Sequence, residues 1–186
     1  MICWASCLAD CDRGASREHI VSDGVFDGKA ITAFGLPWCR DQPVTISLKS
    51  AVAKILCQKH NNALSDFDGE AARFSGFLAR NVIEDPLAES TITLRGALLE
   101  KWALKTFFNL GYVGALHREQ VGRLEPPRHI VEYLFRNSPV ADGVGLYFVT
   151  GTVSSEAYGT GLSWNVIQNP RKLTEVFGMV ICVQWN

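Results

Sequence analysis

The stretch CQKHNN, residues 57–62, places a cysteine and a histidine three residues apart at the start of an apolar helical pattern. Thiolate and imidazole are preferred zinc ligands, so this C-x2-H pair can supply two of the four that a tetrahedral site needs. Downstream, apolar residues recur at steps of three and four, which predicts a helix over 57–80. The stripe that should pack on an N-terminal hairpin is Leu64, Phe67, Ala71, Phe74, Phe77 and Leu78.

Five of the six cysteines lie in the first third of the chain, and Cys182 stands alone. We expect a cytosolic chain, in which clustered cysteines are better interpreted as metal ligands than as a disulfide framework. Cys11 is an alternative ligand that could replace Cys3, because Cys3–Cys7 and Cys7–Cys11 are both spaced C-x3-C. Cys39 and Cys182 are expected to be core thiols. The predicted structural zinc ligands are Cys3, Cys7, Cys57 and His60.

A second group of polar residues is predicted to do chemistry. Glu18 and His19 lie in a predicted strand over 16–21 and project to opposite sides of it unless the strand is bent. If Glu18 binds a metal ion, His19 can act as general base on an attacking water. On the helix after His60, residues Asn61, Ser65 and Asp68 share one face, and such oxygen ligands suit a hard ion such as Mg²⁺.

The rest of the chain predicts an α+β fold. We expect a strand over 44–48, a short helix over 50–57, and a linker over 81–90 between a module at 1–80 and a region at 91–186. That region begins with a helix over 94–110. A second helix starts at Pro126-Pro127 and ends near Asn137. Strands are predicted over 145–150, 164–167 and 179–185.

Composition sets wider limits. The chain has 186 residues, 47% apolar and 20% charged, with a net charge of -1, and residues 1–80 balance nine basic against nine acidic residues. No run of eighteen apolar residues occurs, so we expect a cytoplasmic protein without a membrane partner. Aromatic residues such as Trp102 and Phe107 fit a core better than a base-stacking surface. Residues that form either a basic track or a solvated face are Arg95, Lys101, Lys105, Arg118, Arg123 and Arg128.

Residues 3–75 resemble the HNH endonuclease superfamily, whose fold is called ββα-metal. The resemblance rests on Ser16-Arg17-Glu18-His19-Ile20 and on Leu56-Cys57-x-x-His60-Asn61-x-x-Leu64-Ser65-x-x-Asp68. It implies that a hairpin and a helix hold one Mg²⁺ or Mn²⁺ ion, bound by Glu18 and Asn61 and, less firmly, by Asp68. It also implies that His19 activates water. No asparagine lies between His19 and Cys57, so Ser47 or Ser50 would have to replace the middle asparagine of the family.

Three hypotheses follow. The first is an endonuclease that hydrolyses phosphodiester bonds of DNA, or of RNA, with the C-terminal half contacting substrate or partner. The second is a non-catalytic zinc module that binds nucleic acid or protein, which the absent asparagine favours. The third is a redox or metal sensor whose reactive thiol is Cys11.

Overall fold

A computed structural model describes residues 3–12, 14–26, 28–34, 38–80, 91–115 and 123–139, together with the backbone of two later strands. The strands are β1 (Ala15–His19), β2 (Ala30–Ala33), β3 (Val44–Ser47), β4 (Val52–Cys57), β5 (Gly161–Val166) and β6 (Met179–Gln184). The α-helices are α1 (Gln58–Asn62), α2 (Ser65–Leu78), α3 (Gly96–Tyr112) and α4 (Arg128–Arg136). Single 3-10 turns are η1 (Ser6–Leu8), η2 (Asp23–Val25) and η3 (Leu48–Ser50). The mixed content agrees with the predicted α+β class.

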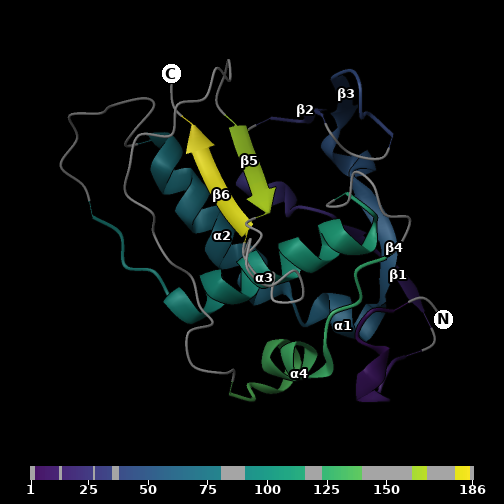
Figure 1. Cartoon of the computed structure of the whole chain (residues 1–186). Helices are drawn as coiled ribbons and strands as arrows, with labels where there is room; N and C mark the ends of the chain where they lie inside the picture. Colours follow the sequence, from purple (N-terminus) through teal and green to yellow (C-terminus); the bar gives the residue numbers. More distant parts are fainter. Residues whose placement is uncertain are drawn as a thin grey trace, which may run out of the picture. The chain divides into compact units, whose positions relative to one another are not determined.

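The N-terminal part is built on β1 paired antiparallel with β4, and α1 follows β4 directly (Figure 1). The long connection between the two strands contains the separate hairpin of β2 and β3. The predicted short helix over 50–57 is wrong, because this segment forms β4. Its residues include β-branched Val52 and Ile55, and its last three side chains are buried, as suits a strand that covers a core.

The predicted helix over 57–80 is interrupted. α1 ends at Asn62, and α2 begins at Ser65 after a turn that buries Leu64. Leu64 still belongs to the apolar stripe with Phe67 and Ala71, which are buried too. Because of the interruption, Asn61 does not share a continuous helix face with Ser65 and Asp68, and this element of the predicted divalent-ion site is not present.

Helix α3 is buried on all sides in its second half, from Lys105 to Tyr112. The predicted apolar face is confirmed, with Leu99, Trp102 and Leu110 buried. The predicted polar face is wrong, because Lys101 is only 5% exposed and Lys105 is fully buried. Neither lysine can therefore belong to a basic track or to a solvated face. Helix α4 ends as expected, with Asn137 in the left-handed conformation that closes helices.

The chain forms two compact units, one of residues 1–76 with 93–146 and one of residues 77–92 with 147–186. Helices α3 and α4 thus belong to the same unit as the N-terminal strands. The second unit contains the antiparallel pair of β5 and β6, and the predicted strands over 164–167 and 179–185 overlap them. The predicted linker 81–90 and strand 145–150 lie outside the described residues. No helix in the described ranges has the length and apolar character needed to span a bilayer.

Candidate metal centre

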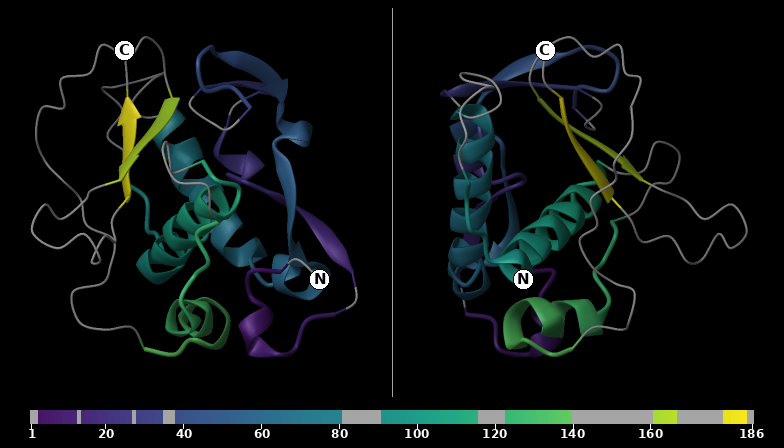
Figure 2. Two further views of the ribbon diagram at one scale, coloured as in Figure 1. Left: turned by 45° about the vertical axis from the view of Figure 1, so that its right-hand side comes forward. Right: turned by 90° about the vertical axis from the view of Figure 1, so that its left-hand side faces the viewer.

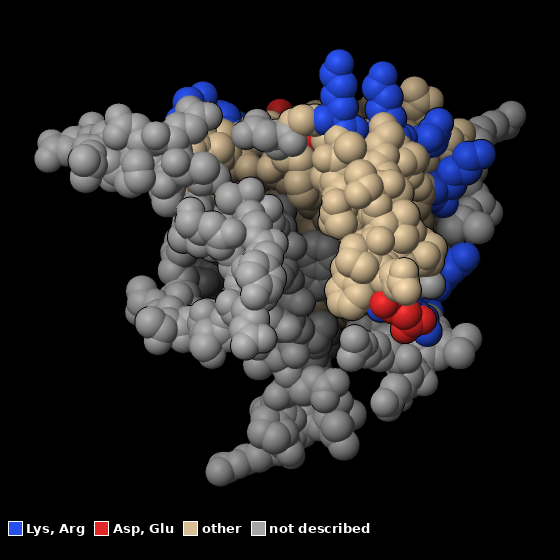
Figure 3. All heavy atoms as spheres, turned by 90° about the horizontal axis from the view of Figure 1, so that it is seen from above, with Lys and Arg blue, Asp and Glu red and all other residues tan. Residues whose placement is uncertain are grey.

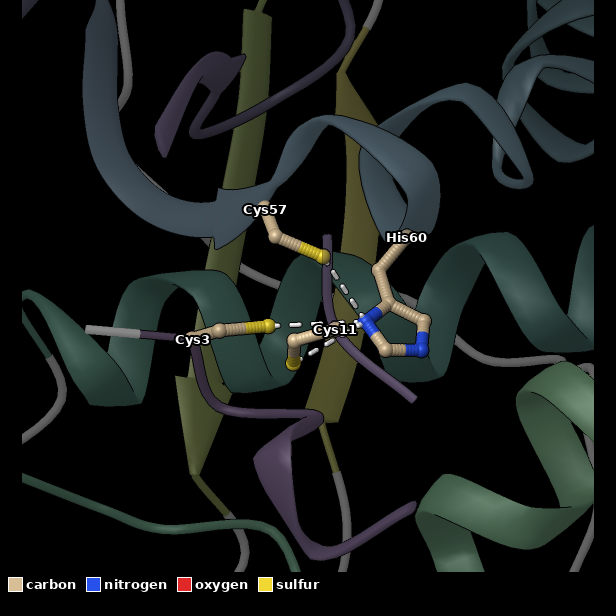
Figure 4. A group of neighbouring side chains, drawn as sticks. All are labelled: Cys3, Cys11, Cys57 and His60. Carbon is tan, nitrogen blue, oxygen red and sulfur yellow. Dashed lines mark hydrogen bonds between the residues drawn. The ribbon is translucent and has the colours of Figure 1, made fainter. Parts of the chain in front are cut away.

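Four side chains converge beside the start of α1. The thiols of Cys3, Cys11 and Cys57 lie 3.6, 3.7 and 3.1 Å from Nδ1 of His60, and the four ligand atoms all lie within 4.8 Å of one another (Figure 4). Zinc bonds of about 2.0–2.3 Å put the ligand atoms of a tetrahedral site about 3.5–3.8 Å apart. The group has both the chemistry and the size to hold a metal ion such as zinc.

Each ligand is positioned by local backbone structure. Cys57 is the last residue of β4, and His60 follows within the first turn of α1. The N-terminal segment lies along the end of β4, where the N–H of Trp4 donates to the carbonyl of Ile55 at 3.0 Å. The chain then reverses through η1 and Ala9, whose φ of 59° is left-handed. This reversal returns Cys11 to the group that Cys3 has already entered.

A second layer of contacts surrounds the histidine. Oδ1 of Asp10 lies 3.1 Å from Nε2 of His60, at an ion-pair distance without the alignment of a hydrogen bond. Lys59 holds Asp10 from the other side at 2.7 Å. Phe135 of α4 packs on the imidazole edge to face, with ring centroids 4.8 Å apart. A carboxylate behind a ligating histidine is a common support of zinc sites, since it fixes the orientation of the ring.

Burial changes the proton affinity of these groups. Desolvation raises the pKa of Cys3, and desolvation together with the neighbouring thiols of Cys3 and Cys57 raises the pKa of Cys11 to about 12. Burial also lowers the pKa of His60, so its ring is neutral at physiological pH. The raised pKa values keep the Cys3 and Cys11 thiols protonated, and a bound metal ion would reverse this by binding them as thiolates. With this raised pKa, Cys11 lacks the low pKa that is typical of a reactive sensor thiol.

The structure changes one predicted ligand. Cys7 lies in η1 with its side chain exposed, while Leu8 of the same turn is buried. Cys11 takes its place, so the group contains Cys3, Cys11, Cys57 and His60. The sequence signal that was missed is the C-x7-C spacing of Cys3 and Cys11, with an apolar residue between them to anchor a turn. Cys39 is buried, as predicted for a core thiol.

A second cluster, here called the Lys105 cluster, consists of Glu18, Ser22, Asp68 and Lys105. The ammonium group of Lys105 lies 2.6 Å from Oε1 of Glu18 and 2.6 Å from Oδ1 of Asp68. Ser22 donates to Asp68 and lies 3.3 Å from Lys105. Glu18 is 3% exposed, and its desolvation raises its pKa in spite of the lysine beside it. Strand β1 and helices α2 and α3 therefore meet at one buried cation.

Two further residues of α3 complete the surroundings of the Lys105 cluster. Trp102 donates its indole N–H to Ser22 at 2.9 Å, and Asn109 donates to Glu18 at 3.1 Å. Asn109 accepts a hydrogen bond from the indole of Trp4 at 3.1 Å. Trp4 follows Cys3, so the metal group and the Lys105 cluster are linked through a short chain of buried contacts.

The residues predicted to hold a catalytic ion are therefore engaged elsewhere. Glu18 and Asp68 share Lys105, while the Asn61 side chain donates to Ser16 at 2.7 Å. The serines considered in place of the missing asparagine, Ser47 and Ser50, are both exposed, and Ser50 donates to the carbonyl of Ser47. The Glu18 and Asp68 oxygens that would bind Mg²⁺ or Mn²⁺ are thus already paired with the ammonium group of Lys105.

His19 lies at the end of β1 on the side opposite to Glu18, as the alternation of a strand predicts. Its side chain is 30% exposed, and Nε2 lies 3.9 Å from a carboxylate oxygen of Asp23. The imidazole is thus accessible to solvent and close to an acidic group.

Comparison of the chain with protein-family models, with curated proteins and with solved structures found no match.

Proposed function

We propose that this protein binds nucleic acid through a zinc-stabilised module made of β1, β4 and α1. The proposal rests on one observation: the described part of the segment from β1 to β4 exposes more basic than acidic side chains. Among its described residues, the exposed acidic side chains are Asp23 and Asp41, and Glu18 is buried. The exposed basic side chains of the same segment are Arg17, Lys29, Arg40, Lys49 and Lys54.

Four of these side chains, Arg17, Lys29, Lys49 and Lys54, form what we call the basic ridge. Arg17 donates to the carbonyl of Lys49 at 3.3 Å, and the carbonyl of Lys29 accepts from the residue before Lys49. Lys54 lies in β4 at the irregularity of register opposite Arg17. Figure 3 shows lysine and arginine side chains gathered along one edge of the described surface. Grouped cations of this kind suit a phosphate backbone.

The metal group supports a structural role for the ion. All four of its ligands are protein side chains, three of them buried, as in closed structural zinc sites. Bound zinc would tie the N-terminal turn to the start of α1 and so hold the end of β4 in place. The chemistry that the ion supplies there is cross-linking, and the contacts to nucleic acid come from exposed side chains elsewhere.

The test is a binding titration with a fluorescently labelled DNA oligonucleotide at several salt concentrations. We expect binding that weakens with salt, and a weaker dependence on salt after Lys49→Gln and Lys54→Gln because two phosphate contacts are removed. The matched control is the double variant Arg128→Gln with Arg136→Gln, which removes two exposed cations from α4. Binding by the parent that is insensitive to salt would exclude the proposed mode of contact.

A second candidate function, hydrolysis of phosphodiester bonds by an HNH-type endonuclease, is favoured by the position of His19. Its accessible imidazole beside Asp23 suits a general base, and Asn61 follows the metal-group residue His60 directly, as the resemblance implies. The binding module ranks first because Glu18 and Asp68 already bind Lys105.

Plasmid cleavage in Mg²⁺ and in Mn²⁺ separates the two candidates. If the protein is an endonuclease, the parent nicks plasmid and His19→Ala reduces the rate by about 10²-fold or more, the contribution of a general base. Zinc content measured on the same samples shows that the variant is folded. Equal cutting by parent and His19→Ala would exclude His19 as the base, and binding without cutting in either ion leaves the binding module.

A further inference from the structure

The hairpin of β2 and β3 has an unusual surface. Phe34 is 58% exposed, Trp38 is 48% exposed and Val44 is 38% exposed, and within the described residues these are the exposed large apolar side chains. All three lie in or next to the connection from β2 to β3, because Ala33 pairs with Val44 and Phe34 comes next. Cys39, between them in the chain, is buried. Apolar side chains gathered in this way mark an interaction site more often than isolated ones do.

The hairpin lies at the end of the unit away from the metal group. In both views of Figure 2 the hairpin lies beyond the pair of β1 and β4, at the end opposite to α1. Its base is tied to the ridge, because the N–H of Leu48 donates to the carbonyl of Lys29 at 3.0 Å. Lys29 and Lys49 thus lie at one end of the hairpin, and the exposed aromatic residues lie at the other end.

The ridge also reaches the end of β1 that carries His19. The N–H of Ile20 donates to the carbonyl of Ala51 at 3.1 Å, and Ala51 is two residues from Lys49. A chain that followed the ridge from the hairpin would therefore pass beside His19. Cations along a track followed by exposed aromatic rings are the two components of a surface for single strands: the cations contact phosphates and the rings stack on unpaired bases.

We propose that Phe34 and Trp38 stack on unpaired bases and that the basic ridge holds the backbone of the same strand, so that the ligand is single-stranded nucleic acid. The inference rests on the proposed function, and it narrows the ligand from nucleic acid in general to strands with accessible bases. A paired duplex hides its base faces and leaves the two rings without a partner, so it should bind through the ridge alone.

The test compares a labelled single-stranded oligonucleotide of about twenty nucleotides with the duplex of the same sequence, by fluorescence anisotropy on the full chain. We expect the parent to bind the single strand more tightly. Phe34→Ala with Trp38→Ala should weaken single-strand binding by at least about tenfold and change duplex binding little, because each stacked base contributes several-fold to affinity. Phe34→Tyr with Trp38→Tyr should restore it, since tyrosine also stacks.

Gln42→Ala is the matched control, because Gln42 is an exposed polar residue of the same connection, and this variant should bind as the parent does. Unchanged single-strand binding in the double alanine variant would overturn the inference while leaving the proposed function intact. A parent that bound neither oligonucleotide would overturn both. Vesicles containing an anionic phospholipid form the last arm, and binding to them that depends on the two rings, with single-strand binding unaffected, would assign the hairpin to a membrane surface instead.

Discussion

Lys105 carries a full charge into the interior of the protein, where its ammonium group meets two carboxylates. A buried charge is tolerated only when it is paired and hydrogen-bonded, and Glu18, Asp68 and Ser22 meet this requirement. The arrangement is sensitive to the loss of one partner, because the remaining charges cannot be solvated.

Lys105→Met is therefore expected to lower the free energy of unfolding by about 3–5 kcal/mol, since it leaves Glu18 and Asp68 facing each other without a cation. Urea denaturation followed by circular dichroism measures the change. Lys54→Met serves as the control, because Lys54 is exposed on β4, and it should change stability by less than about 0.5 kcal/mol. Equal effects of the two substitutions would contradict the assigned role of the Lys105 cluster.

The metal group gives a second prediction for single residues. Cys11→Ser should reduce the zinc bound per chain and the melting temperature, because a hydroxyl is a much poorer zinc ligand than a thiolate. Cys7→Ser should change neither quantity, because Cys7 is exposed and lies outside the group. Metal analysis of the two purified variants is the measurement, and the opposite result would restore Cys7 as the ligand.

At the scale of elements, helix α2 connects the parts of its unit. Its buried stripe faces the core, and its first turn supplies Asp68 to the Lys105 cluster. The 3-10 turn η2 packs closely on it: a Cβ atom placed on Gly24 would lie 2.9 Å from Cβ of Ala72. Glycine is needed at Gly24 because a side chain there would push η2 away from the helix.

Two glycine substitutions test this packing. Gly24→Ala should destabilise the protein by about 1–3 kcal/mol through overpacking. Gly69→Ala, within α2 itself, meets no atom within 4 Å and should stabilise the protein by about 0.5–1 kcal/mol, because alanine is the better helix former. Thermal unfolding of both variants measures the difference, and a neutral Gly24→Ala would show that η2 moves freely on α2.

At the scale of the whole unit, Glu70 fastens the segment before α3 to α2. Its fully buried carboxylate accepts hydrogen bonds from the backbone of Arg95 at 2.7 Å and from the side chains of Arg73 and Arg95. The backbone N–H of Arg95, and then the two guanidinium groups, lower the pKa of Glu70. The ionised carboxylate is thus favoured in the folded state.

This shift has a defined consequence for acid stability. Because the folded-state pKa lies below the ordinary value of 4.5, the stabilisation is fully present above that pH and is lost as the pH falls through the folded-state pKa. Glu70→Gln should lower stability at pH 7, and the gap between parent and variant should close in acid. Asp66→Asn, at an exposed position of α2, is the control, and a gap that is independent of pH would contradict the assignment.

Features that depend on a few neighbouring residues could be predicted from the sequence: the pair of Cys57 and His60, the apolar faces of α2 and α3, and the end of α4 at Asn137. Ligand chemistry and helical periodicity are encoded within one or two turns, so they can be predicted without knowing the fold. The predicted Cys/His group comes from the right segments of the chain, although its member from the N-terminal turn is Cys11 and not Cys7.

Three features could be seen only in the folded chain: which cysteine completes the metal group, that residues 52–57 form a strand, and that Lys105 is buried. Each outcome depends on contacts between distant parts of the chain. The reversal at Ala9 returns Cys11 to Cys3. Pairing with β1 makes a strand of residues 52–57, although their apolar residues have helical spacing. Glu18 and Asp68 together neutralise Lys105, which the helix pattern assigned to the surface. Local sequence cannot encode these results, because the free energy that selects them comes from partners up to about a hundred residues away.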